Sequence, residues 1–233
     1  MSPGREAPKA SSSVLDLIGG TPLLRLSRSS PEGGAEVWGK VEASNPGGSV
    51  KDRICKAMVE EAESQGLLKP GHSTIIEATS GNTGIGLAMV ACARGYACIL
   101  AMPRDMSVER RHILESYGAR IILTDPDEGM KGAVARAEAE AAGIKGSWLP
   151  RQFENPANPE CHFRTTGPEI WSQMEGRVDA LVAGVGTGEA GAGTVGAAGG
   201  AVGSGWASSM SSTCSAIARA SASQEIRPVS IRI

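Results

Sequence analysis

Residues 74–94 read TIIEATSGNTGIGLAMVACAR, and this stretch decides the fold. A short apolar run, Thr74 to Ala78, passes through a turn of small polar residues and glycines into a helix predicted from about Ile85 to Arg94. A buried strand that leads through such a turn into a helix is the repeating unit of α/β proteins. Because ligands bind where strand ends open into loops in such sheets, the turn is also the first candidate site.

The same alternation of strands and helices continues on both sides of this stretch. Strands are predicted at 37–42, 97–102, 121–124 and 180–185, and helices at 51–65, 108–117 and 131–142. This order predicts an α/β fold in which parallel strands are covered by helices.

The character of the sequence changes at Glu189. From there to Ile233, 26 of 45 residues are Gly, Ala or Ser, and neither a helical nor a strand period is visible. Because such a segment can bury little apolar surface to offset its ordering entropy, we expect residues 189–233 to be disordered or weakly structured.

Composition excludes several classes of function. The net charge of −2 leaves no basic excess for nucleic acid or anionic lipid, and no apolar run approaches the roughly 18 residues of a membrane helix. Five cysteines and three histidines show no zinc-ligand spacing. We therefore expect no metal site. We also expect reduced thiols in a cytoplasmic protein, with targeting to an organelle as the open alternative.

Three glycine-containing segments carry the candidate chemistry. The first is NPGGSVKDR at 45–53, where Lys51 follows a turn at the start of a helix. A partly desolvated lysine there could act as a nucleophilic amine, although the spacing taken alone favours an ordinary solvated lysine beside a turn.

The second segment, TSGNTG at 79–84, offers hydroxyls, an amide and backbone N–H groups at a helix start. It is either a cradle for a carboxylate or an ordinary capped turn. The third, GVGTG at 184–188, lets the backbone approach a phosphate. A dinucleotide fingerprint is disfavoured, because Glu189 stands where its third glycine should be.

In this order the three segments resemble the cysteine-synthase (O-acetylserine sulfhydrylase) family of fold-type-II pyridoxal-phosphate enzymes, which are related in fold to tryptophan synthase β. IGGTPL at 18–23, QFENPANP at 152–159 and TTGPEI at 165–170 extend the resemblance. It covers roughly residues 13–188. It implies two parallel-sheet domains, with the N-terminal segment of the large domain at 1–49, a small α/β domain at 50–155, and a partial large domain at 156–188. The atypical segment 189–233 replaces the remainder of the large domain.

The resemblance also assigns roles to individual residues. Lys51 would form the Schiff base with pyridoxal 5′-phosphate, and Asn82 would bind the 3′ oxygen of the cofactor. The remaining matches are Gly184, Gly186, Thr187 and Gly188 for the cofactor phosphate, and Thr79, Ser80, Asn82, Thr83 and Gln152 for the substrate carboxylate.

The implied reaction replaces the acetate of O-acetyl-L-serine by sulfide and gives L-cysteine, in a homodimer that some relatives bind to serine acetyltransferase. Glu189 in the phosphate loop and the altered segment after it predict weak cofactor binding and little turnover. The alternatives are a cystathionine β-synthase-like enzyme, or a non-catalytic fragment that binds the C-terminal peptide of serine acetyltransferase.

Overall fold

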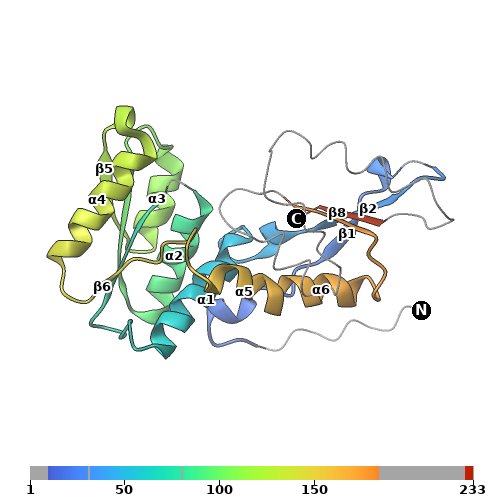
Figure 1. Ribbon diagram of the computed structural model, residues 1–233, viewed down its shortest axis with the longest axis horizontal. Coiled ribbons are helices and arrows are strands. Elements are labelled where there is room, and N and C mark those ends of the chain that lie inside the picture. Colours follow the sequence, from blue (N-terminus) through green and yellow to red (C-terminus); the bar gives the residue numbers. More distant parts are fainter. Residues whose placement is uncertain (1–9, 31, 80, 184–228, 233) are drawn as a thin grey trace. The chain divides into compact units, whose positions relative to one another are not determined.

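The computed structural model describes residues 10–30, 32–79, 81–183 and 229–232. The described residues divide into two compact units: the first comprises residues 10–20 and 45–150, and the second comprises residues 21–44, 151–183 and 229–232. Each unit combines a sheet with helices, which confirms the predicted α/β class (Figure 1). In the described part of the chain, no helix is long and apolar enough to cross a membrane.

The first unit is built on a four-stranded parallel sheet in the order β5-β4-β3-β6. Its strands are β3 (Thr74–Ala78), β4 (Ala97–Pro103), β5 (Arg120–Thr124) and β6 (Ser147–Trp148). Helices α1 (Lys51–Ser64), α2 (Asn82–Arg94), α3 (Val108–Ser116) and α4 (Gly129–Gly143) belong to the same unit, as do the 3-10 turns Val14–Leu17 and Pro126–Glu128.

Successive side chains along each strand point to opposite faces of the sheet, so the core of the first unit has two layers. On one face of the sheet, Ile76 and Ile99 pack with Ala133 and Ala137 of α4. The small alanines let the helix lie close to the strands. The opposite face is covered from the side of α2, since the Leu100 side chain lies beside Gly84. Figure 1 shows α2 and α4 on either side of this sheet.

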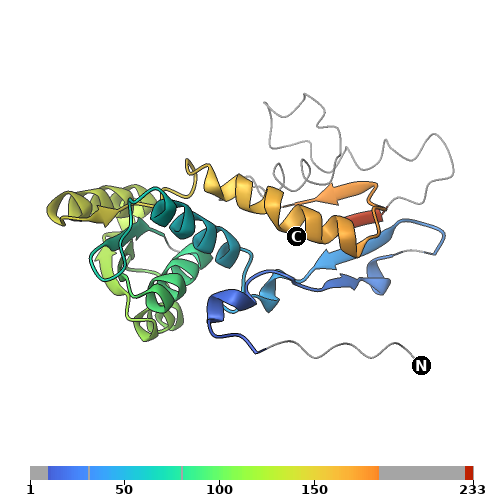
Figure 2. The same ribbon diagram turned by 90° about the horizontal axis from the view of Figure 1, so that it is seen from below.

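The second unit holds a sheet in the order β1-β2-β8-β7, formed by β1 (Leu23–Arg25), β2 (Glu36–Lys40), β7 (Ala180–Val182) and β8 (Val229–Arg232). The pairs β2–β8 and β8–β7 are parallel, whereas β1 adds an antiparallel edge strand. Helices α5 (Ala157–Arg164) and α6 (Thr166–Gln173) complete the unit (Figure 2), with the 3-10 turns Ser27–Ser29 and Glu42–Ser44. Ile170 and Met174 form the core under this sheet with the packed side chains of Leu23, Trp38, Val178 and Leu181.

One difference from the sequence prediction concerns this second unit. Residues 229–232 form β8, although the composition of 189–233 predicted disorder or weak structure. The reason is that β2 and β7 supply ladders on both sides of a β-branched segment, VSIR, which local composition does not reveal. Residues 10–20 and 45–49 lie in the first unit, and the predicted division into a large and a small domain stays a prediction.

Candidate active site

A tight turn fixes the start of α1 and therefore the backbone of Lys51. The carboxylate of the buried Asp52 accepts a hydrogen bond from the backbone N–H of Gly47 at 2.6 Å, and the Ser49 hydroxyl accepts one from the N–H of Lys51 at 3.1 Å. A Cβ at position 47 would lie 2.5 Å from an Asp52 oxygen, and Gly48 has φ +83. The two glycines predicted to form the turn are thus required by space and by backbone angle.

Lys51 is a half-buried amine at the first position of α1. Burial lowers the pKa of its amine from 10.5, because the ammonium form loses hydration. A thiolate at Cys55 would act in the opposite direction, but burial, followed by the Asp52 and Glu77 carboxylates, raises the pKa of Cys55 well above 9.0. Cys55 therefore stays protonated, and burial determines the direction for Lys51. The result is a larger neutral fraction of amine than a solvated lysine would have.

The turn between β3 and α2 forms the second part of the site. The N–H of Thr79 extends the β3–β4 ladder to the Ala101 carbonyl, and the Thr79 hydroxyl accepts a hydrogen bond from the N–H of Gly81 at 3.3 Å. Among the described residues, no side chain caps the N-terminus of α2. The positive end of the α2 dipole, with the exposed Asn82 at the first helical position, therefore favours an anion nearby.

Helices α1 and α2 are in contact near their N-terminal ends, and this contact brings the two predicted segments together. The Cys55 thiol donates a hydrogen bond to the Thr83 carbonyl at 3.4 Å. A Cβ at position 86 would lie 3.4 Å from the backbone oxygen of Lys51. The roles of Cys55 and Gly86 were not predicted from the sequence, because nothing in the residues around either position indicates a contact between residues 31 positions apart.

The topology of the sheet places this contact where a ligand site is expected. From β3 the chain proceeds to β4 and β5 on one side, whereas β6 pairs with the other side of β3. The strand order thus reverses at β3, and ligands of open α/β sheets bind at such a reversal, beyond the carboxyl ends of the strands. Thr79 is the residue that follows the carboxyl end of β3.

The remaining predicted site residues are not among the described residues of the first unit. Ser80, Gly184, Gly186, Thr187 and Gly188 lie outside the described residues. Gln152 belongs to the second unit, where it is buried and its backbone carbonyl accepts a hydrogen bond from the Asn158 side chain at 2.9 Å. Within the described ranges, no three His, Cys, Asp or Glu side chains gather as metal ligands would.

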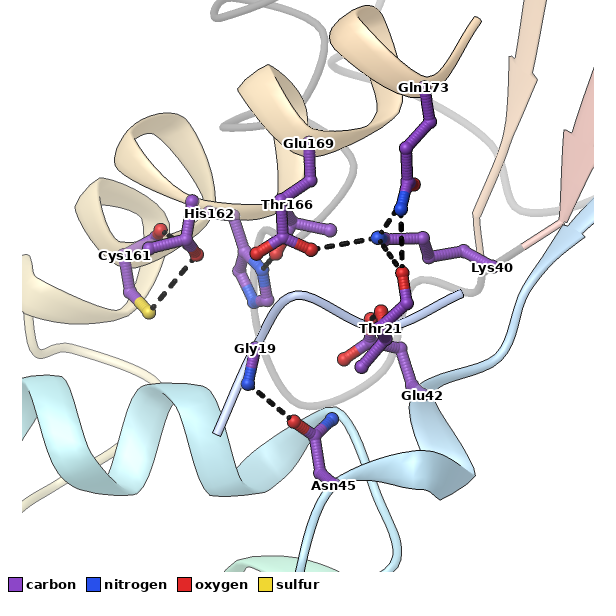
Figure 3. A network of polar contacts seen from close by, with 11 residues as sticks. Gly19, Thr21, Lys40, Glu42, Asn45, Cys161, His162, Thr166, Glu169 and Gln173 are labelled. Atoms are coloured by element: carbon purple, nitrogen blue, oxygen red, sulfur yellow. Dashed lines mark hydrogen bonds and ion pairs between the residues drawn. The ribbon is translucent and has the colours of Figure 1, made fainter. Parts of the chain in front are cut away.

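The second unit contains a buried polar network that sequence reasoning missed (Figure 3). The Lys40 amine contacts Glu169 Oε2 at 2.7 Å, Gln173 Oε1 at 2.9 Å and the Thr21 carbonyl at 2.6 Å. The Thr21 hydroxyl donates to Glu42 at 2.6 Å. All three donors of the ammonium group are satisfied, so the network ties β2 to α6 and serves structure rather than chemistry.

A second buried pair in this unit joins α5 to α6. His162 Nδ1 lies 2.9 Å from the Thr166 hydroxyl, and both residues are fully buried. The contact spans the junction at Thr165 between the two short helices. His162 is therefore a structural residue of the interior.

The described residues fit a cofactor that carries an electrophilic carbon and acidic oxygens. A half-buried amine of lowered pKa suits attachment to such a carbon. The uncapped start of α2 suits an anionic group nearby. This fit rests on the first unit alone.

Comparisons with known proteins agree with this chemistry. A family model described as "Pyridoxal-phosphate dependent enzyme" matches residues 14–224. Cysteine synthase of Staphylococcus aureus (strain Mu50) is 52% identical over 183 residues, which are 78% of this chain and 58% of the relative. The chain therefore spans less than two thirds of the length of that relative.

Solved structures show the same likeness. A hydrogen sulfide-producing enzyme from Fusobacterium nucleatum has 42% identity and a TM-score of 0.77, over 82% of this chain and 62% of that one. An O-acetylserine-dependent cystathionine β-synthase from Helicobacter pylori has 36% identity and a TM-score of 0.76, over 82% of this chain and 63% of that one.

Proposed function

The chain belongs to the family of pyridoxal-phosphate-dependent enzymes, and on this premise we propose that it serves cysteine synthesis, in which sulfide replaces the acetate of O-acetyl-L-serine. One observation carries the proposal: Lys51 is a half-buried amine of lowered pKa on a helix turn that contacts the turn of α2. That combination supplies a nucleophile and an anion cradle within one rigid unit.

Each residue has a role in this proposal. Pyridoxal phosphate, when bound, supplies the electron sink for cleavage at the substrate Cα. The Lys51 amine attaches the cofactor and, once released by substrate, holds the proton taken from Cα. Thr79, Asn82 and Thr83, with Ser80 and Gln152, bind the substrate carboxylate and exclude water when the turn closes on it. Asn82 also orients the cofactor, and Gly184, Gly186, Thr187 and Gly188 hold its phosphate.

The test begins with the purified full chain and added pyridoxal phosphate. We expect a visible absorbance band from cofactor attached to a lysine, loss of that band in Lys51→Ala, and a borohydride-trapped adduct on the peptide that contains Lys51. Cysteine formation from O-acetyl-L-serine and sulfide is then measured. An adduct on other lysines with none on Lys51 would refute the proposal.

A second candidate is favoured by the likeness to the Helicobacter pylori enzyme, whose name joins O-acetylserine to cystathionine synthesis. In that reaction a thiol amino acid, homocysteine, takes the place of sulfide. A panel that offers sulfide or homocysteine with O-acetyl-L-serine or L-serine separates the two readings. Preferential use of homocysteine would replace the leading proposal.

The start of α2, which no described side chain caps, supports a non-catalytic alternative. In this alternative the turn of α2 binds the carboxylate of a peptide without turnover. The probe is the C-terminal peptide of serine acetyltransferase, with its amidated form as the control. Binding of the free-acid peptide without any cysteine formation would favour this reading.

We also propose a homodimer in the cytoplasm. Large apolar side chains in the second unit, Phe163 at 47% exposure and Trp171 at 42%, provide surface for association. The cysteines described as free thiols, Cys55, Cys92, Cys98 and Cys161, suit a reducing compartment. Light scattering after size exclusion tests the first statement, and localisation of a tagged chain tests the second.

A further inference from the structure

Cys55 lies at the contact between α1 and α2. Its side chain is fully buried, and its thiol donates to the Thr83 carbonyl at 3.4 Å. Cys55 lies one helical turn after Lys51, so the two side chains share a face of α1. A shift of the Cys55 turn against α2 therefore also moves Lys51.

Gly86 is the partner that makes room for the sulfur. A Cβ at position 86 would lie 2.8 Å from Cys55 Sγ and 3.2 Å from Cys55 Cβ. The first separation is shorter than packed atoms tolerate, so α1 can hold this position only while residue 86 has no side chain. Cys55 and Gly86 are thus matched in size across the helix contact.

The buried state of the thiol excludes the other roles that a cysteine could have. Burial and the Asp52 and Glu77 carboxylates raise the pKa of Cys55, so the thiol stays protonated and is a poor nucleophile. A protonated thiol does remain a hydrogen-bond donor, which is the function that its contact with Thr83 uses.

We propose that Cys55 is a positioning residue, which sets Lys51 against the first turn of α2 through its size-matched contact with Gly86. This inference rests on the proposed function, in which Lys51 and Asn82 act on one cofactor. A displacement of a few tenths of an ångström along this contact changes both the solvation of the Lys51 amine and its alignment with Asn82.

The test uses the full chain as Gly86→Ala, Cys55→Ala, the double variant, and Cys98→Ala. Cys98 supplies the matched control, because it is another buried thiol of the first unit but lies on β4 and not on α1 or α2. The first readout is the pH midpoint for labelling of Lys51 by an amine-reactive reagent, measured without cofactor by peptide mass spectrometry. The second is the rate of cofactor attachment.

We expect Gly86→Ala to raise the midpoint of Lys51 labelling and to slow cofactor attachment about tenfold, because small displacements of a reacting group cost rates of this order. Removing the sulfur as well should restore both values to within about threefold of the original, with Cys98→Ala close to the original throughout. If Gly86→Ala does not fold, Cys55→Ala and Cys55→Ser replace it. The serine variant should keep the midpoint and the alanine variant should raise it.

An unchanged labelling midpoint in Gly86→Ala, or in Cys55→Ala where that variant replaces it, would overturn the inference. A double variant that regains its stability towards urea but not its pH midpoint of Lys51 labelling would also overturn the inference, because the contact would then be merely structural. Because labelling needs no cofactor, it decides the inference even if cofactor attachment fails in every variant. Failure of attachment in the unaltered chain counts against the proposed function instead.

Discussion

Burial of Lys51 couples function to stability at the level of one residue. The unfolded chain holds the Lys51 proton up to its ordinary pKa of 10.5, whereas burial lowers the pKa in the folded state. The folded state therefore binds fewer protons between the two values, and the free energy of unfolding rises with pH in that window. The cost of burying the ammonium is fully present below the folded pKa.

Lys51→Met should accordingly raise the thermal midpoint of the cofactor-free protein at pH 7, and the advantage should shrink as pH approaches 10.5. Thermal unfolding followed by circular dichroism from pH 7 to 10 measures the difference. Lys145→Met, at an exposed position, is the matched control and should change little. A Lys51→Met variant that is less stable at every pH would contradict the prediction.

Asp52 organises the turn that presents Lys51, and its removal should be costly. Asp52→Ala leaves the Gly47 N–H without its 2.6 Å partner inside the first unit. Loss of a buried hydrogen bond to a charged group costs about 1.5–3 kcal/mol in the free energy of unfolding. Urea titration measures this value, and Glu61→Ala on the exposed side of α1 should stay within about 0.5 kcal/mol. Equal losses in the two variants would exclude a special role for Asp52.

Sequence reasoning reached some residues of the site and not others for a physical reason. Lys51 and Thr79 stand beside local signals, a glycine turn before a helix and a strand end before a turn, and both signals lie within a few residues. Their chemical roles remain predictions. The contact between Cys55 and Gly86 depends on how two helices cross, and no local pattern encodes that crossing.

At the scale of elements, α2 ends sharply because of Gly95. This residue has φ +75 and donates its N–H back to the carbonyl of Cys92 at 3.4 Å, and no atom lies within 4 Å of a Cβ built there. Gly95→Ala should therefore destabilise the protein by about 1–2 kcal/mol through backbone strain alone. Gly143→Ala, also in open space at the end of a helix but with no left-handed angle, should be neutral or slightly stabilising. Urea midpoints of the two variants, measured side by side, test the difference.

Elements with a strong local period were predicted closely, and those without one were not. β3 was predicted at 74–78 and has those bounds, while α2 begins at Asn82 instead of Ile85, because its polar first turn lacks the apolar period that marks a helix. Helices α5 and α6 were missed, since each is only 8 residues long and contains a proline. β8 depends on pairing with strands far away in sequence, so composition alone gave no sign of it.

At the scale of the whole molecule, the two units draw stability from different sources. The first unit buries many large apolar side chains, including Ile54, Met58, Leu87 and Leu100. The second packs fewer large side chains around Ile170 and Met174 and adds the buried network of Lys40. Damage to the network should therefore affect the second unit far more than the unit that carries Lys51.

Lys40→Met tests this division of stability. The substitution removes the fully buried cation that pairs with the partly buried Glu169, and breaking one side of such a pair costs up to about 3–5 kcal/mol. The double variant Lys40→Met/Glu169→Met should be less destabilised than the single one, because no unpaired charge remains. Arg25→Met, which breaks the exposed pair with Glu36 on the neighbouring strands, should cost less than about 1 kcal/mol.

Hydrogen exchange with peptide resolution should show the loss of protection in β2 and α6, while the pH midpoint of Lys51 labelling stays unchanged. If Lys40→Met costs no more than Arg25→Met, the network does not hold the second unit together.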